Sequence, residues 1–178
     1  MNATSVDLRY PIRRYEAPET ITADQRNAWI TELSNLPRDL KEAISGLSDA
    51  QLDTAYRPGG WSVRQVVHHL PDSHINCYVR FRLALTEPSP LIKPYEEAAW
   101  AELADAKTAP AAPSLALLDA LHARWVFLLE TLGDEDFART FRHPELGDIK
   151  LDWTLGLYAW HSRHHLAQIT GLRERSGW

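Results

Sequence analysis

The chain of 178 residues has one cysteine, no long apolar run and no excess of basic residues, and each absence excludes a class of protein. Because Cys77 has no second cysteine to pair with, no intramolecular disulfide can form, which is usual for proteins of a reducing cytoplasm. The longest apolar stretches fall far short of the ~20 residues of a membrane span, so we expect no integral membrane protein. The first 20 residues contain charged side chains and no apolar run, so we expect no secretory signal.

The charge balance argues against a further class, the dedicated nucleic-acid-binding proteins. Nineteen Lys and Arg residues stand against twenty-four Asp and Glu residues, which gives a formal net charge of −5. A nucleic-acid-binding domain normally has a basic overall charge and a clustered basic face. We therefore expect a cytoplasmic protein whose partner is a small molecule, and neither nucleic acid nor a membrane.

Strand-forming patterns are nearly absent, whereas four long segments repeat apolar residues every three or four positions, the spacing of amphipathic helices. These segments cover about residues 22–45, 62–86, 114–132 and 152–175. Shorter helical pieces are expected at 48–54, 95–104 and 134–138. A chain of this length usually forms one domain, so we predict that residues 1–178 fold as a single all-α four-helix bundle.

An N-terminal arm, one long connection and two prolines are expected to make this bundle depart from a simple up-and-down arrangement of straight helices. Residues 1–20 are expected to form an extended N-terminal arm, and the long, Pro-rich connection at 87–113 between the second and third helices could be a crossover. Pro37 and Pro71 lie inside the first and second helices. Because proline removes one i→i−4 hydrogen bond, each predicts a bend.

Histidine is frequent in this chain, and six of the eight residues fall in two short windows of the second and fourth helices. These six are His68, His69, His74, His161, His164 and His165. His161 and His165 are four residues apart, so their side chains lie ~40° apart and ~6 Å along one helix face, which lets both bind one ion. Two buried imidazoles without a carboxylate partner are costly, and a divalent metal resolves that cost. Ser162 follows His161, which excludes the H-E-x-x-H metalloprotease motif.

A third metal ligand must come from another helix, and the second helix offers three candidates. On a helical wheel His74 lies in the centre of the apolar stripe, and His68 and His69 lie on its opposite margins. His68 is four residues before Asp72, a spacing typical of a surface ion pair. The wheel therefore slightly favours His69 and leaves His74 open. The two isolated histidines, at positions 122 and 143, are expected to be exposed or internally satisfied.

The margin that carries His69 also contains Asn76 and Arg80, a polar stripe typical of a helix that lines a wet cleft. Arg80 is eleven residues beyond His69, ~16 Å by axial rise, which is too far for chemistry at a metal. That reach suits the anionic end of an extended cofactor, and it equally suits a structural ion pair. We predict that Arg80 and Asn76 bind substrate.

Residues 56–70 resemble the DinB/YfiT-like superfamily, whose members show G-W-S before a helix that ends in H-L. A later helix of the family carries H-x-x-x-H followed by Q-I. In this chain the corresponding pieces are Gly60-Trp61-Ser62, His69-Leu70, His161 to His165 and Gln168-Ile169. Further matches to the YfiT branch extend from Tyr10-Pro11-Ile12 to Gly177-Trp178, so the resemblance covers essentially the whole chain.

The resemblance implies a four-helix bundle with a divalent metal ion held by His69, His161 and His165, and a homodimer. Zinc and nickel both suit imidazole ligands. The activity implied is that of a hydrolase or of a thiol S-transferase, which joins a low-molecular-weight thiol such as bacillithiol to electrophiles. Three neutral nitrogens leave an open position, where a metal-bound water or a thiolate, rather than an assigned side chain, is the catalytic group. The alternative is a non-catalytic helical domain that serves metal binding or protein interaction.

Overall fold

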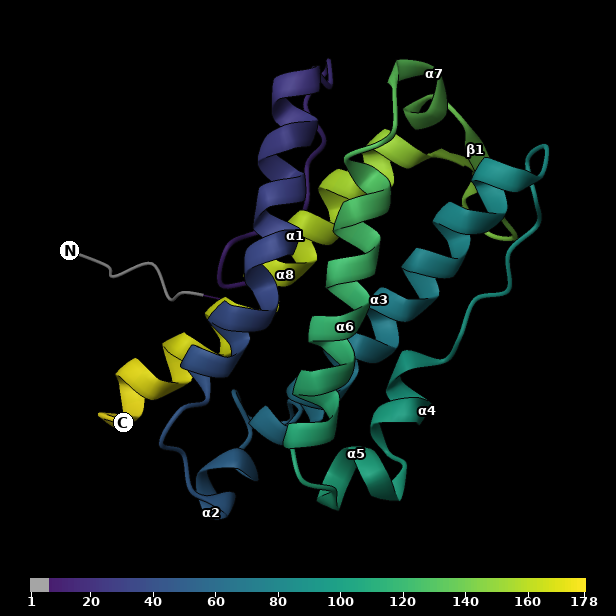
Figure 1. Cartoon of the computed structure of the whole chain (residues 1–178). Helices are drawn as coiled ribbons and strands as arrows, with labels where there is room; N and C mark the ends of the chain where they lie inside the picture. Colours follow the sequence, from purple (N-terminus) through teal and green to yellow (C-terminus); the bar gives the residue numbers. More distant parts are fainter. Residues whose placement is uncertain (1–6) are drawn as a thin grey trace.

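A computed structural model describes residues 7–178 of the chain, and in these residues four long helices form a bundle (Figure 1). The long helices are α1 (Ala23–Ala43), α3 (Val63–Thr86), α6 (Ala112–Leu129) and α8 (Leu151–Ser176). The short helices are α2 (Asp49–Leu52), α4 (Glu97–Ala101), α5 (Ala104–Thr108) and α7 (Asp134–Phe137). The predicted all-α four-helix bundle is confirmed, and the Pro-rich connection holds α4 and α5, which both pack on α3.

A small hairpin that the sequence pattern did not predict precedes α8. Strands β1 (Thr140–His143) and β2 (Gly147–Lys150) pair antiparallel, with Thr140 opposite Lys150. Each strand has only four residues, and Phe141 is the one fully buried side chain among them, so the alternation was too short to read.

The bundle interior consists of two apolar clusters with a polar layer between them. α1 and α3 each pack against both α6 and α8 (Figure 1), and all four long helices contribute to both apolar clusters. The first cluster includes Trp29, Leu33, Phe81, Trp125 and Leu155, and the second includes Leu40, Val66, Leu118 and Ile169. The layer between them, which we call the histidine layer, contains His69, His74, His122, His161 and His165.

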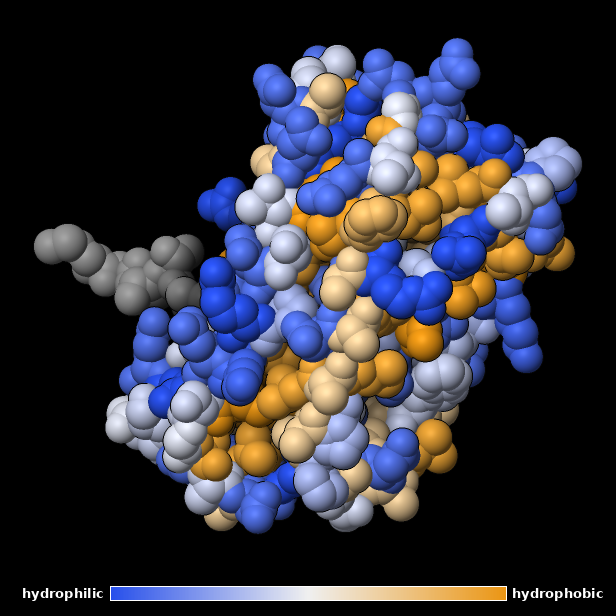
Figure 2. Space-filling view, viewed as in Figure 1, coloured by the Kyte–Doolittle hydropathy of each residue, from blue (hydrophilic) through white to orange (hydrophobic). Residues whose placement is uncertain are grey.

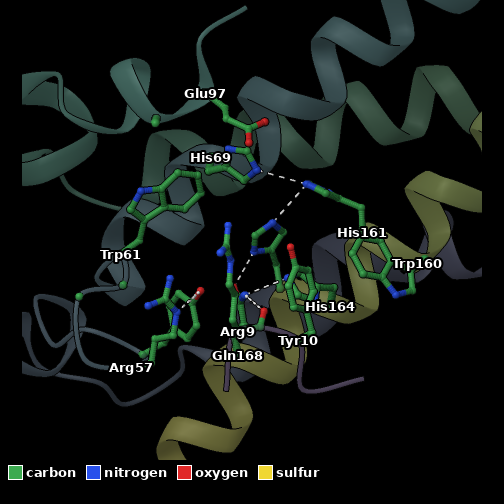
Figure 3. Close-up of a pocket in the computed structure, with 15 residues that line it drawn as sticks. Arg9, Tyr10, Arg57, Trp61, His69, Glu97, Trp160, His161, His164 and Gln168 are labelled. Atoms are coloured by element: carbon green, nitrogen blue, oxygen red, sulfur yellow. Dashed lines mark hydrogen bonds between the residues drawn. The ribbon is translucent and has the colours of Figure 1, made fainter. Parts of the chain in front are cut away.

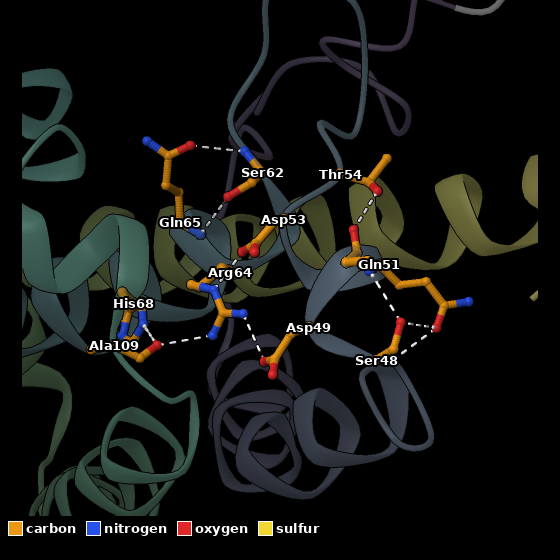
Figure 4. A network of polar contacts seen from close by, with 11 residues as sticks. Ser48, Asp49, Gln51, Asp53, Thr54, Ser62, Arg64, Gln65, His68 and Ala109 are labelled. Atoms are coloured by element: carbon orange, nitrogen blue, oxygen red, sulfur yellow. Dashed lines mark hydrogen bonds and ion pairs between the residues drawn. The ribbon is translucent and has the colours of Figure 1, made fainter.

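Polar contacts fix the start of α3, six residues before His69 (Figure 4). Ser62 and Gln65 form a capping box, with each backbone N–H donating to the other residue's side chain. The Arg64 guanidinium is buried and binds the carboxylates of Asp49 and Asp53, and it also donates to the carbonyl of Ala109. The connection before α6 is thereby tied to the helix that carries His69.

Two prolines lie within helices without ending them. α1 continues through Pro37 and α3 through Pro71. Because proline has no N–H, the carbonyls of Leu33 and Val67, four residues earlier, lack their usual helical donors.

The arm before α1 packs along α8. Residues 7–22 contain turns but no helix or strand. The extended arm expected for 1–20 stays a prediction, and residues 1–6 of it lie outside the described part. Tyr15 and Trp29 approach α8 at Gly156, where an added Cβ would lie 2.7 Å from the Trp29 ring and would also collide with the Tyr15 hydroxyl. The Trp160 indole donates to the carbonyl of Arg13 at 3.2 Å.

Within residues 7–178, α6 is the one helix long and apolar enough to cross a membrane, judged by length and composition alone. The uninterrupted runs of the sequence did not reveal this property, because polar residues are spaced through the helix. Leu118, Trp125 and Leu129 of α6 are buried in the bundle, whereas Leu117 and Phe127 are exposed. Figure 2 shows apolar residues along this outward face, so α6 serves the bundle core with only part of its surface.

Candidate metal centre

Two helices bring three imidazoles together at the edge of the histidine layer. α3 supplies His69, and α8 supplies His161 and His165, one turn apart on one face. The Nε2 atom of His161 lies 3.2 Å from the Nε2 atoms of both His69 and His165. All three donor nitrogens lie within 4.8 Å of one another, so the structure assembles the residue set named from the sequence. That these residues bind a metal stays a prediction.

The donor set fits a divalent cation. Two imidazole nitrogens ~2.1 Å from one ion are about 3.0 Å apart at a right angle and about 3.4 Å apart at the tetrahedral angle, and the 3.2 Å separations lie between. Burial lowers the pKa of His69 to about 4 and the pKa values of His161 and His165 well below the ordinary value. The three imidazoles are therefore neutral near pH 7, which is the form that ligates metals.

A hydrogen bond orients the ring of His165. Its Nδ1 lies 2.8 Å from Oε1 of Gln168, which can only accept, so Nδ1 carries the proton and Nε2 has a free lone pair. The Gln168 amide nitrogen donates to the Arg9 carbonyl at 3.4 Å and to Nε2 of His164 at 2.9 Å. The N-terminal arm thus helps to hold a candidate ligand.

The three imidazoles open into a cavity of about 370 Å³ (Figure 3). Four aromatic residues line it: Tyr10, Tyr56, Trp61 and Trp160. Trp61, from the loop before α3, packs on His69 with the ring centroids 4.8 Å apart. Arg9 and Arg57 are also in the wall, and none of the ion pairs found among residues 7–178 includes either one.

A second cavity, of about 230 Å³, is lined by His161 from another side. Arg80 lies in its wall with Ser73, Tyr95 and Tyr158, and Arg80 takes part in no ion pair within the described chain. The Tyr95 hydroxyl is buried, and no partner for it occurs in residues 7–178. Burial raises the pKa of Tyr95 to about 12, so its hydroxyl keeps the proton and can donate it to an anion.

Two other residues named from the sequence lie elsewhere. The Asn76 side chain donates to the Asp72 carbonyl of its own helix at 2.8 Å, and its substrate-binding role stays a prediction.

The expectation of a surface ion pair between His68 and Asp72 is wrong. His68 is buried, and its ring nitrogens lie 2.7 Å from Ser114 Oγ and 3.2 Å from the Ala109 carbonyl. The Pro-rich connection and α6 cover this side of α3, and a helical wheel cannot show such a cover.

The remaining histidines divide between the interior and a cavity wall. His74 is fully buried and contacts both His161 and His122, so it is a core histidine with hydrogen-bond partners. His122 is also buried and hydrogen-bonded. His143 is half-buried and lines the smaller cavity.

The periodic patterns did not identify the cavity-lining residues outside the long helices. Arg9 comes from the arm, Arg57 from the loop before α3, and Tyr95 and Glu97 from the Pro-rich connection and the start of α4. The arm and the loop before α3 have no helical repeat, and the short helical piece expected at 95–104 gave no sign of which of its side chains face a cavity. The usable signal was the resemblance itself, since its matched stretches include Arg57 and the segments around Tyr10 and Tyr95.

Comparison with known proteins places the chain among relatives that are named putative metal-dependent hydrolases. The model of the DinB superfamily matches residues 24–169. A Bacillus subtilis protein named "Putative metal-dependent hydrolase YfiT" is 55% identical over 176 residues, which cover 98% of this chain and 99% of the relative. A Bacillus cereus protein named "Putative metal-dependent hydrolase" is 56% identical over 172 residues, with 97% and 99% covered.

Two solved structures share the architecture. The structure of YfiT from Bacillus subtilis, described as a probable metal-dependent hydrolase with an unusual four-helix bundle topology, superposes with a TM-score of 0.94. It is 55% identical, and the match covers 97% of this chain and 99% of that one. TT2238, described as a four-helix bundle protein, matches with a TM-score of 0.56 at 20% identity over 82% of this chain and 98% of its own. This second likeness concerns the fold alone.

Proposed function

The chain belongs to the DinB superfamily, and from that premise we propose that it is a hydrolase that depends on one divalent cation, zinc or nickel, held by His69, His161 and His165. The observation that carries the proposal is the convergence of three neutral Nε2 atoms at the wall of a cavity. Three protein donors leave room for substrate or water at the cation. A bound cation there supplies a Lewis acid that polarises a substrate oxygen and lowers the pKa of water.

Other side chains of the two cavities would transfer the proton and bind the substrate. Glu97 is the one acidic residue among those lining the two cavities, and it belongs to both walls. Its carboxylate takes the proton from the attacking water and returns it to the leaving group. Arg80 and the Tyr95 hydroxyl hold an anionic group of the substrate, with Asn76 on the same margin of α3, and the aromatic wall of the larger cavity binds an apolar group.

The metal centre is tested by metal content together with hydrolysis. Protein stripped with a chelator and reloaded with zinc or nickel is assayed on a panel of ester and amide substrates. The variants His69→Ala, His161→Ala and His165→Ala should each lose most of the bound metal and the hydrolysis. The matched control His68→Ala removes a buried imidazole next to a proposed ligand and should keep both. Full metal occupancy in His69→Ala would show that the ligand set is wrong.

The proton-transfer role is tested separately. Glu97→Gln should lower kcat by ~10²–10⁴-fold without changing the metal content, because a general base is lost and no metal ligand is. Glu96→Gln is the control, since Glu96 is the neighbouring exposed carboxylate and lines neither cavity. Equal losses in the two variants would contradict the assignment of Glu97.

Thiol S-transfer is the second candidate function, and one observation favours it. Arg9 and Arg57 face the larger cavity without ion-pair partners in the described residues, an arrangement that suits the carboxylates of a low-molecular-weight thiol. A cation held by the three histidines would lower the pKa of a coordinating thiol. The reloaded protein is therefore also assayed with a panel of thiols and electrophiles. Conjugation without any hydrolysis would favour this candidate over the hydrolase.

A further inference from the structure

A chain of hydrogen bonds leads from His161 through the histidine layer to the backbone of α1. Nδ1 of His161 lies 3.2 Å from Nε2 of His74, and Nδ1 of His74 lies 2.9 Å from Nε2 of His122. Nδ1 of His122 lies 2.6 Å from the Leu33 carbonyl oxygen. The chain therefore joins α8, α3, α6 and α1 in one line of contacts, and it starts at a proposed metal ligand.

The last contact determines the direction of every other one. The Leu33 carbonyl can only accept, so His122 carries its proton on Nδ1 and its Nε2 accepts. Nδ1 of His74 then donates to His122, and Nε2 of His74 accepts from Nδ1 of His161. His161 is consequently protonated on Nδ1, which leaves the lone pair of its Nε2 turned toward His69 and His165.

The chain requires that its imidazoles be neutral, and their surroundings enforce this. His74 and His122 are 0% and 1% exposed. Their ring neighbours are Trp125, which faces both, and Tyr158, which faces His74. No carboxylate bonds either ring within residues 7–178, and burying an unpaired charge there would be very costly. Burial correspondingly lowers the pKa of both histidines.

The accepting carbonyl is available because of a proline. In an uninterrupted α1, the N–H of residue 37 would bond the carbonyl of Leu33. Pro37 has no N–H, so the Leu33 carbonyl would be a buried acceptor without a donor. His122 supplies that donor. His122 of α6 thus donates to the carbonyl that Pro37 leaves without a helical donor, and this carbonyl is the acceptor that His122 needs.

We propose that His74 and His122 are positioning residues of the metal centre, which hold His161 in the tautomer whose Nε2 can bind the cation. Ligating histidines generally depend on an acceptor at the second ring nitrogen, and losing it typically costs 10–100-fold in metal affinity. In this chain the acceptor for Nδ1 of His161 is His74, whose own tautomer is set by His122 and the Leu33 carbonyl. The inference rests on the proposed metal centre, and it assigns no contact with substrate to either residue.

The first experiment measures zinc affinity by competition with a chromogenic chelator. In His122→Leu, His74 loses its acceptor and is free to take the other tautomer, which turns a proton toward His161. The Kd for zinc should rise by ~10–100-fold. The control is His68→Leu, which removes another buried, doubly hydrogen-bonded imidazole from the same bundle and should leave the Kd unchanged. Equal weakening in both variants, or none in His122→Leu, would overturn the proposal.

The second experiment reads the tautomers in the metal-free wild-type protein by ¹⁵N NMR of labelled histidines. His161, His74 and His122 should all be protonated on Nδ1, and a proton on Nε2 of His161 would overturn the proposed hydrogen-bond chain even if the variants failed to fold.

The proposed metal centre and the proposed positioning role fail in different ways. Wild-type protein that binds neither zinc nor nickel refutes the metal centre and any positioning role within it, whereas the wrong tautomer in a metal-binding protein refutes only the positioning role.

Discussion

The histidine layer and the two apolar clusters lie in the same bundle, but different interactions hold them together. The clusters around Phe81 and Leu118 are held by burial of apolar surface, which has no preferred direction and tolerates apolar substitutions that conserve volume. In the layer, by contrast, every hydrogen bond of His74 and His122 has a donor and an acceptor that cannot be exchanged singly. The clusters therefore account for the stability of the fold, and the layer accounts for what the fold presents to a ligand.

The sharpest way to test this division is to damage a cluster alone. Phe81 is 0% exposed, and Phe81→Ala should lower the free energy of unfolding by ~3–5 kcal/mol through lost burial and a cavity. Urea denaturation measures this loss. The zinc affinity of the folded variant should match the wild type. Phe127→Ala, at a side chain 73% exposed, is the control and should change stability little. A weakened zinc site in folded Phe81→Ala would break the division.

Acid should damage the layer before the clusters. Burial lowers the pKa of His122 to about 4 in the folded protein from an ordinary value near 6.5. The unfolded chain then binds the extra proton between these values, so stability falls as the pH drops from about 6.5 to 4, by up to ~3 kcal/mol for this group. Urea titrations of metal-free protein across this range test the effect. His122→Leu should show a shallower dependence on pH, and an unchanged slope would refute the assignment.

Removing the metal should affect the layer while the clusters persist. A cation that binds only the folded state stabilises it by ~2.7 kcal/mol at a hundredfold excess over Kd. Chelation should therefore lower the Tm without unfolding the protein, because the clusters do not depend on the ion. Thermal melts with and without chelator, followed by circular dichroism, measure this. Complete unfolding on chelation would show that the site is structural and would argue against catalysis.

The smallest expected effect concerns the edge of the layer, where Arg80 faces the smaller cavity. Arg80→Lys keeps the charge but loses the planar fork, so the KM for an anionic substrate should rise severalfold, with metal content and Tm unchanged. Steady-state kinetics on the best substrate of the panel, with a neutral analogue as control, test this. A lower Tm with an unchanged KM would make Arg80 part of the scaffold.

The sequence predicted the elements with a repeating pattern well and the contacts between elements poorly. The second helix, expected at 62–86, is Val63–Thr86 in the structure, because a capping box and an apolar stripe define it locally. His161 and His165 were recognisable as a pair because their four-residue spacing lies within one helix. His122 looked isolated because its partner, His74, is 48 residues away, and a wheel drawn for one helix contains no information about the next. The resemblance, rather than periodicity, selected His69.

The path of the hydrogen-bond chain has a consequence for folding kinetics. It takes one group from each long helix, Leu33, His122, His74 and His161, so it is complete only when all four have docked. Because these contacts need all four helices, we expect them to form late in folding, so their loss should accelerate unfolding more than it slows refolding. The layer would then contribute to the lifetime of the native protein, and the groups proposed to position a metal ligand would also slow its unfolding.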